Sequence, residues 1–343
     1  MVLVAWSCFA CHFNTNTGRG AAALVGRGVV NNPQNKSLRF DMIKYGLDAF
    51  CRELLERGAP LRLTDGQPVI GRYFGSRCNA KSIEALERDT IVLQFSGQGY
   101  AWTAGTGRLG FRAAGLLELA PDFRIYEEAM YVYFRPVQVD TSAFELLMTE
   151  QPMAEAAAEI AGIDEEQLGK AIIDAQLGRG FTAIRYDADG HADFALGLIE
   201  KGSAPFLPYR VLSSPRATLA NGRTELFAGQ QDFIGRIAVK SGQPLTITLE
   251  MDGAPSVDFA LLSEQATTPH LQAYLTAPGT PALQVTPSFV ARAVRGTRTR
   301  AEVSLPPGRY YLVLDHSRAL GQTSPEPRAL PARVDYLIQS GRR

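Results

Sequence analysis

The feature that most constrains the fold is a change in the spacing of apolar residues near Ala217. Before it, two stretches have apolar residues at helical spacing and the rest has alternating or short apolar runs; after it, short β-type runs are separated by Gly and Pro. Alternation is typical of antiparallel strands, and many short strands are typical of a sandwich. The pattern predicts an α+β domain, with an antiparallel sheet and two helices, followed by an all-β sandwich domain.

The same change divides the chain into three segments. Residues 1–37 are expected to be a clipped export signal or anchor followed by a tether rich in Asn, Gly, Thr and Ala. Residues 38–217 are expected to form the α+β domain, and residues 218–343 the β-sandwich. Two domains are also what 343 residues predict, because single cores stop growing at about 250 to 300 residues.

Within the first domain, a helix is expected to begin at Asp41, whose side chain can cap free amide groups, and to end before Gly58 and Pro60. A second helical region at 153–177 should lie across the sheet. A hairpin is expected to turn at Asp189-Gly190.

Strands are expected in both domains. In the first they are 69–74, 90–96, 109–119, 123–126, 130–139, 181–186 and 193–199. In the second they are 233–239, 244–251, 256–262, 300–305, 309–315 and 333–338, and a helix is expected there at 268–275.

Charge and hydropathy exclude two classes of protein. Lys plus Arg and Asp plus Glu number 35 each, so the chain lacks the positive field that attracts phosphate backbones, and nucleic acid is not expected as a partner. No stretch approaches the roughly 20 apolar residues that span a bilayer. The mature body is therefore not expected to be transmembrane.

The apolar opening run from Met1 to Phe13 resembles the end of an export signal that lacks its charged first segment. Bacterial lipoproteins attach lipid to a cysteine directly after such a run. Cys8 and Cys11 are therefore the candidate lipid anchors, although the residues before each depart from the lipobox pattern. This predicts a protein of the bacterial cell envelope, in the periplasm or at the outer membrane, that contacts the membrane through an N-terminal lipid.

The remaining cysteines, Cys51 and Cys78, flank a loop short enough to close. In an oxidising compartment a disulfide between them would stabilise the fold by about 3 kcal/mol on the chain-entropy model. The alternative is two buried free thiols, as expected of a cytosolic protein. We predict the disulfide, conditional on export.

The strings Gly-Arg-Tyr-Tyr-Leu-Val-Leu-Asp-His-Ser, at 308–317, and Ala-Arg-Val-Asp-Tyr-Leu-Ile, at 332–338, resemble the terminal strands of bacterial β-sandwich modules. Those modules are similar to pre-peptidase C-terminal and GOLD-like (Golgi-dynamics) domains. The resemblance implies a sandwich that acts as an appended binding or spacer module.

The order of elements over 38–199 is similar to that of YceB-type envelope lipoproteins of the tubular lipid-binding superfamily. This resemblance rests on element order, and it implies an apolar groove between helix and sheet. The alternative is that the same apolar side chains fill a closed core. The groove candidates are Ile43, Leu47, Phe50, Leu54, Ile160, Leu168 and Ile172.

One motif offers a different function. Cys8-Phe9-Ala10-Cys11-His12 fits C-x-x-C-H, in which two thiols bond to haem vinyl groups and the histidine binds the iron. The motif lies inside the hydrophobic opening run, and no compact helical pattern follows it. Haem c attached at Cys8, Cys11 and His12 is therefore an alternative to the lipid anchor, and no other cofactor is expected.

Other motif-like strings have structural explanations. The G-x-G-x-x-G match at 105–110 lies between two expected strands, so it predicts a hairpin turn and not a dinucleotide site. The four histidines are too widely separated to predict a metal site. Asp315, His316 and Ser317 are neighbours on an expected strand, where side chains alternate between faces and cannot form a relay. The G-x-S-x-G elbow of hydrolases is missing, and no catalytic residues are predicted.

The sequence thus predicts a non-catalytic envelope (lipo)protein that binds lipid or another apolar ligand in the helix–sheet groove. The sandwich is expected to mediate contacts with envelope proteins. The alternatives are a structural or adhesive surface protein without a small ligand, and the haem protein described above.

Overall fold

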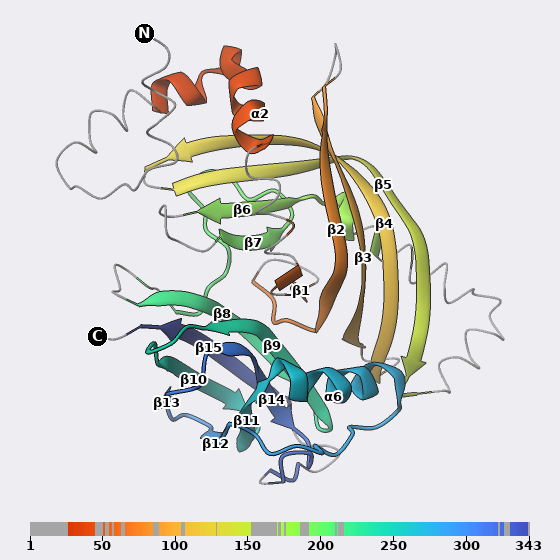
Figure 1. Ribbon diagram of the computed structural model, residues 1–343, viewed down its shortest axis with the longest axis vertical. Helices are drawn as coiled ribbons and strands as arrows, with labels where there is room; N and C mark the ends of the chain where they lie inside the picture. The colour runs from red at the N-terminus through yellow and green to blue at the C-terminus, as the bar shows by residue number, and fades with distance from the viewer. Residues whose placement is uncertain are drawn as a thin grey trace.

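The computed structural model describes most of the chain from residue 27 onward, and the protein is mostly β (Figure 1). Its strands form three antiparallel sheets, one of seven strands and two of four. The described residues are 27–44, 51, 55–56, 58–62, 66–84, 89–103, 107–127, 129–151, 170, 173–174, 176–185, 192–209, 211, 216–321, 323–325 and 330–341.

The seven-stranded sheet has its strands in chain order, each antiparallel to the next. Figure 1 shows β2 to β5 as long, strongly bent ribbons whose lower ends approach the sandwich. The strands are β1 (Ala59–Leu61), β2 (Gly71–Ile83), β3 (Thr90–Thr103), β4 (Gly107–Tyr126), β5 (Ala129–Thr149), β6 (Phe181–Arg185) and β7 (Ala192–Leu196).

One face of this sheet is buried and the other is largely solvated. On β4, Phe111, Leu117 and Phe123 are buried, whereas Arg112 and Leu116 on the opposite face are exposed. This alternation is what a half-covered antiparallel sheet produces. The prediction of two separate strands at 109–119 and 123–126 was wrong, because Pro121 interrupts the sequence pattern without ending the strand.

Helix α2 (Lys36–Lys44) covers part of the buried face, and Phe40 and Ile43 belong to the core that it forms with the sheet. The prediction that a helix begins at Asp41 was wrong. A 3₁₀ turn, Pro33–Asn35, starts the helical segment earlier, and the side chain of Asn32 accepts a hydrogen bond from the Gln34 amide. Asp41 lies inside the helix and pairs with Lys44 at 3.0 Å.

Most of the second expected helix, 153–177, lies outside the described residues, as does most of 45–57. The described residues 173–174 and 176–178 are helical. The antiparallel sheet predicted for the first domain is confirmed, and its α+β class stays a prediction.

The sandwich consists of two four-stranded sheets, in the orders β13-β10-β15-β8 and β12-β11-β14-β9. Helix α6 (Glu264–Thr276) begins after Ser263, whose side chain caps it. Two of the strands, β8 and β12, were not predicted. The strands are β8 (Ala217–Leu226), β9 (Gln230–Val239), β10 (Leu245–Gly253), β11 (Ser256–Ser263), β12 (Phe289–Val294), β13 (Thr299–Val303), β14 (Gly308–His316) and β15 (Ala332–Ser340).

The largest core does not divide where the sequence pattern changes. Phe74, Tyr100 and Trp102 of the seven-stranded sheet pack in the same hydrophobic cluster as Phe233 and Tyr274 of the sandwich. β8 begins at the predicted boundary of 217, but the cluster spans that boundary. The sheet and the sandwich are therefore held together by shared apolar packing.

Candidate functional site

A buried ion pair joins the two parts of the molecule. Arg72 on β2 donates two hydrogen bonds to Asp232 on β9, from Nε at 2.6 Å and from Nη2 at 2.9 Å. Both side chains are almost wholly buried. Tyr100 donates to Asp232 at 2.8 Å, and Tyr336 accepts from Arg72 at 3.1 Å. Burial and the charge of Asp232 raise the pKa of Tyr100, which keeps its hydroxyl a donor.

A second buried arginine fixes the sheet against α6. The guanidinium of Arg108 lies 3.8 Å from the centre of the Tyr274 ring. Its Nη2 donates to the carbonyls of Ala277 at 2.9 Å and Gly279 at 2.8 Å, just after the helix ends. A cation is favourable at a helix C-terminus, where the last carbonyls lack helical partners. Together with the Arg72–Asp232 pair, this contact holds the sandwich at a fixed position on the sheet.

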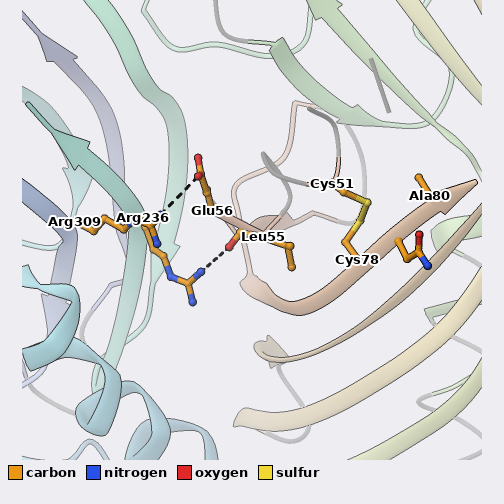
Figure 2. A pocket seen from close by; sticks show the side chains of 8 residues that line it. Cys51, Leu55, Glu56, Cys78, Ala80, Arg236 and Arg309 are labelled. Carbon is orange, nitrogen blue, oxygen red and sulfur yellow. Dashed lines mark hydrogen bonds and ion pairs between the residues drawn. A yellow bond between two sulfur atoms is a disulfide. The ribbon is translucent and has the colours of Figure 1, made fainter. Parts of the chain in front are cut away.

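Beside this junction a cleft of about 460 Å³ opens between β2 and the sandwich (Figure 2). We call it the disulfide cleft, because the Cys51–Cys78 bond forms part of its wall. Its lining comes from β2, from β9 and β14 of the sandwich, and from Cys51, Leu55 and Glu56, which precede β1 in the chain. The lining residues are Cys51, Leu55, Glu56, Cys78, Asn79, Ala80, Arg236 and Arg309.

The disulfide between Cys51 and Cys78 confirms the predicted pairing, with 5.3 Å between the Cα atoms. It ties the segment that carries Leu55 and Glu56 to strand β2. Figure 2 places Leu55 and Glu56 between the disulfide and the two arginines of the sandwich. The disulfide therefore positions one wall of the cleft opposite the other.

Arg236 enters the cleft from a β-bulge. β9 and β14 pair Ile237 with Tyr310 and Gly235 with Tyr311, so Arg236 is the extra residue and is not paired in the ladder. Bulges commonly redirect a side chain in this way. Its Nη1 donates to the Leu55 carbonyl at 2.7 Å, and its Nε lies 2.7 Å from Glu264 and 3.2 Å from the Tyr311 hydroxyl.

Arg309, on β14, is held more loosely. Its guanidinium lies 3.8 Å from Glu56 and 3.9 Å from Glu264, both longer than a hydrogen bond. Its side chain is 50% exposed, against 29% for Arg236. The cleft therefore has one arginine fixed by several partners and one attracted to its partners mainly by charge.

The predicted site residues are placed as follows. Ile43 is 8% exposed and packs in the core between α2 and the sheet, in the same cluster as Cys51, and it is not among the residues that line the disulfide cleft. The proposed lipid groove, lipid anchor and haem site stay predictions. Outside the described residues lie the groove candidates Leu47, Phe50, Leu54, Ile160, Leu168 and Ile172, and also Cys8, Cys11 and His12.

The surroundings of two motif-like strings are described by the structure. β3 and β4 pair antiparallel on either side of 104–106, which agrees with a hairpin at the glycine-rich string. Asp315 accepts hydrogen bonds from Ser317, from Gln231 at 3.1 Å and from the Leu320 amide at 2.8 Å. His316 Nδ1 instead contacts the Leu226 carbonyl at 3.1 Å. These residues fix the loop after β14 and do not form a relay.

In the described part of the chain, no three His, Cys, Asp or Glu side chains gather so that they could hold a metal ion. None of the described helices is long and apolar enough to cross a bilayer.

Comparison with protein-family models and with curated proteins gave no match. Among solved structures, the chain is similar to a glycoside hydrolase family 43 arabinoxylan arabinofuranohydrolase from Bacillus subtilis, determined in complex with cellotetraose. The two share 10% identity with a TM-score of 0.23, over 77% of this chain and 79% of that one.

The prediction that the chain is not an enzyme is contradicted by this match, because the matched protein is a glycoside hydrolase. The exclusion rested only on the lack of local catalytic motifs, and catalytic residues that are dispersed along a chain form no such motif. We therefore withdraw it. At a TM-score of 0.23, the similarity carries no argument for hydrolase activity either.

The charged residues of the junction and the cleft were missed by the sequence analysis. Arg236 interrupts the apolar run from Phe233 to Val239, and Asp232 directly precedes it. A charged residue within an apolar strand is the signal that could have found them, since it needs a partner when buried. Which partner it finds depends on strand register, which the sequence does not reveal.

Proposed function

We propose that this chain is an extracytoplasmic binding protein of the bacterial envelope that holds a small polar ligand in the disulfide cleft. The observation that carries the proposal is the cleft of about 460 Å³ between β2 and the sandwich. Its volume lies within the range of about 300 to 1,000 Å³ that is usual for ligand pockets. Its lining includes two guanidinium groups and a carboxylate that can orient a ligand.

The rigidity of the walls supports this proposal. The Arg72–Asp232 pair and the contact of Arg108 with Tyr274 fix β9 and α6 against the sheet. The disulfide fixes the segment that carries Leu55 and Glu56. Walls that are ordered before binding lower the entropy that a ligand must overcome.

The proposed compartment rests on the disulfide, because structural disulfides persist mainly in oxidising compartments. An N-terminal lipid at Cys8 or Cys11 would keep the protein at the membrane, and it is part of the proposal. So is an α+β first domain whose second helix, at 153–177, crosses the sheet. The burial of Ile43 favours a packed core over a lipid groove under α2.

The test is native mass spectrometry of the full chain purified from the periplasm of an exporting host. Asn79→Trp would fill the cleft from an exposed position on β2, and Lys81→Trp is the matched control, exposed on the same strand but outside the lining. We expect a non-covalent small-molecule adduct on the wild type and on the Lys81→Trp variant, and its loss from Asn79→Trp. An adduct that Asn79→Trp retains would contradict the proposal.

Where no adduct survives purification, the same three proteins are screened with a library of small metabolites for increases in melting temperature. The proposal predicts stabilising compounds that act on the wild type and the control but not on Asn79→Trp. A library without any such compound would also contradict it.

A further inference from the structure

Two guanidinium groups meet in the disulfide cleft from neighbouring strands of the sandwich. Arg236 lies 2.7 Å from Glu264, and Arg309 lies 3.9 Å from the other oxygen of the same carboxylate. Glu264 thus holds both arginines at one side of the cleft. Figure 2 shows both arginine side chains on the sandwich side, opposite the disulfide.

The two arginines differ in what they can offer a ligand. Arg236 is already bonded to the Leu55 carbonyl at 2.7 Å and to the Tyr311 hydroxyl at 3.2 Å. Arg309 is half exposed, and its ion pairs with Glu56 and Glu264 are too long for hydrogen bonds. Its planar fork of N–H donors matches the two oxygens of a carboxylate. Arg309 can therefore accept such a partner without leaving a close one.

The carboxylate of Glu56 would compete with a ligand for Arg309. It projects into the cleft from the disulfide-tied segment, its side chain is 45% exposed, and it lies 3.8 Å from Arg309. An exposed pair of this kind contributes about 0–1 kcal/mol, so a ligand can displace it at little cost. With Glu56 displaced, Glu264 is the one carboxylate that the described residues place within 4 Å of the two guanidinium groups, so these three groups carry the net positive charge that suits one anionic group.

We propose that the ligand of the disulfide cleft is a small carboxylate, which binds Arg309 beside Arg236 and displaces Glu56. This inference rests on the proposed function and names the chemical class of its ligand. The carboxylate oxygens accept hydrogen bonds from Arg309, Arg236 holds the second positive charge next to them, and the rest of the ligand extends toward Asn79 and Ala80.

The test is calorimetric titration of the full, disulfide-bonded chain with succinate, with succinamide as the uncharged probe of the same shape. We expect succinate to bind and succinamide to bind at least about tenfold more weakly, because hydrogen bonds to charged groups are worth about 1.5–3 kcal/mol. Raising the salt concentration should weaken succinate binding, because the site is partly exposed.

Three variants separate the roles of the residues. Arg309→Gln should weaken succinate binding roughly tenfold or more. Glu56→Gln should strengthen it about two- to fivefold, because the competing carboxylate is gone. The control Arg333→Gln removes an arginine that is 60% exposed and paired with Glu225 on the sandwich, and it should leave binding unchanged.

Weaker binding by Glu56→Gln would overturn the inference, since Glu56 would then be a partner of the ligand and not its competitor. Sulfate is the second anionic probe, and binding as tight as that of succinate would overturn the assignment to a carboxylate. If no anion binds but Asn79→Trp still abolishes the natural adduct, the inference fails and the proposed function stands. If Asn79→Trp has no effect either, both fail.

Discussion

Strand β9 contributes to two arginine–carboxylate arrangements of opposite character, because it carries Asp232 of the buried junction and, four residues later, Arg236 of the disulfide cleft. At Asp232 the pair with Arg72 is dry, with side-chain exposures of 0% and 4%, and two tyrosine hydroxyls complete its hydrogen bonds. At the cleft, Arg309 and Glu56 are 50% and 45% exposed and lie 3.8 Å apart. The same chemical groups are thus fully engaged in one place and replaceable in the other.

Burial accounts for the difference. Removing one partner of a buried pair leaves a charge without water or a counter-charge, which is strongly unfavourable. Removing one partner of an exposed pair returns the other to solvent at little cost. The Arg72–Asp232 pair can therefore fix the sandwich on the sheet, whereas Arg309 of the cleft stays available to a ligand.

The largest loss of stability is expected when the buried ion pair between the sheet and the sandwich is broken. Asp232→Ala should lower the free energy of unfolding by about 3–5 kcal/mol, because Arg72 remains buried without its counter-charge. Glu225→Ala, which breaks the partly exposed pair with Arg333, should cost no more than about 1 kcal/mol. Urea denaturation of the three proteins measures both values. Equal losses in the two variants would remove the distinction between the regions.

The next largest loss of stability is expected when the disulfide is removed. It closes a loop with a sequence separation of 27, so the Cys51→Ala/Cys78→Ala variant should lose about 3–4 kcal/mol on the chain-entropy model. It should also bind succinate more weakly, because Leu55, whose carbonyl accepts a hydrogen bond from Arg236, is no longer tied to β2. Wild-type protein under reducing conditions should behave like the variant. An unchanged urea midpoint would show that the bond does not constrain the chain.

The pH dependence of stability tests how dry the sandwich interior is. His270 is 7% exposed, and burial lowers its pKa to about 4, from 6.5. The unfolded chain therefore binds more protons between these values, and stability should fall as the pH decreases from about 6.5 to 4. The loss can reach about 3 kcal/mol.

The variant His270→Gln is the control for the contribution of His270. The nearby Asp315 titrates in both proteins, so its contribution cancels when the free energies of unfolding of the two proteins are subtracted. The difference in free energy of unfolding between the wild type and His270→Gln should therefore depend on pH between 6.5 and 4. A difference that is constant over this range would mean that His270 is solvated in the folded state.

A smaller effect is expected at the bulge that positions Arg236. A Cβ atom on Gly235 would lie 2.7 Å from the Tyr311 ring and 2.9 Å from the Tyr310 carbonyl. Gly235→Ala should therefore cost about 1–3 kcal/mol and weaken succinate binding. Gly28→Ala is the control, because a Cβ there meets no atom within 4 Å. Full stability and binding in Gly235→Ala would show that the bulge tolerates a side chain.

The smallest effect on stability is expected at the cleft arginine itself. Arg309→Gln should change the free energy of unfolding by less than about 0.5 kcal/mol, because its ion pairs are long and half exposed. A loss above about 2 kcal/mol would mean that Arg309 is structural, like Arg72.

Local patterns allowed part of the fold to be predicted. The spacing of Cys51 and Cys78 indicated their disulfide, and short apolar runs placed strands such as β11 and β14 within a few residues. The start of α2 was misplaced, because Asp41 is a good capping residue but Asn32 and the proline turn act earlier in the chain. β8 was not predicted, since its Asn and Gly residues weaken the strand pattern.

The disulfide cleft could not be predicted in the same way. Arg236 and Arg309 are brought together by the pairing of β9 with β14, and the bulge at Tyr310 and Tyr311 decides which side chain leaves the ladder. Glu56 lies about 180 residues before Arg236 in the sequence, and the disulfide holds it near the cleft. The cleft is thus produced by the register of β9 with β14 and by the disulfide, both of which join residues far apart in the sequence. Neither is marked by a local sequence motif.

The contrast between the buried Arg72–Asp232 pair and the arginines of the cleft can be tested most directly by NMR. The Nε–H signals of Arg72, Arg236 and Arg309 would be observed during a titration with succinate. The account predicts that the Arg309 and Arg236 signals move in a saturable way while the Arg72 signal stays fixed. Movement of the Arg72 signal with the other two unchanged, or no movement at any of the three, would contradict it.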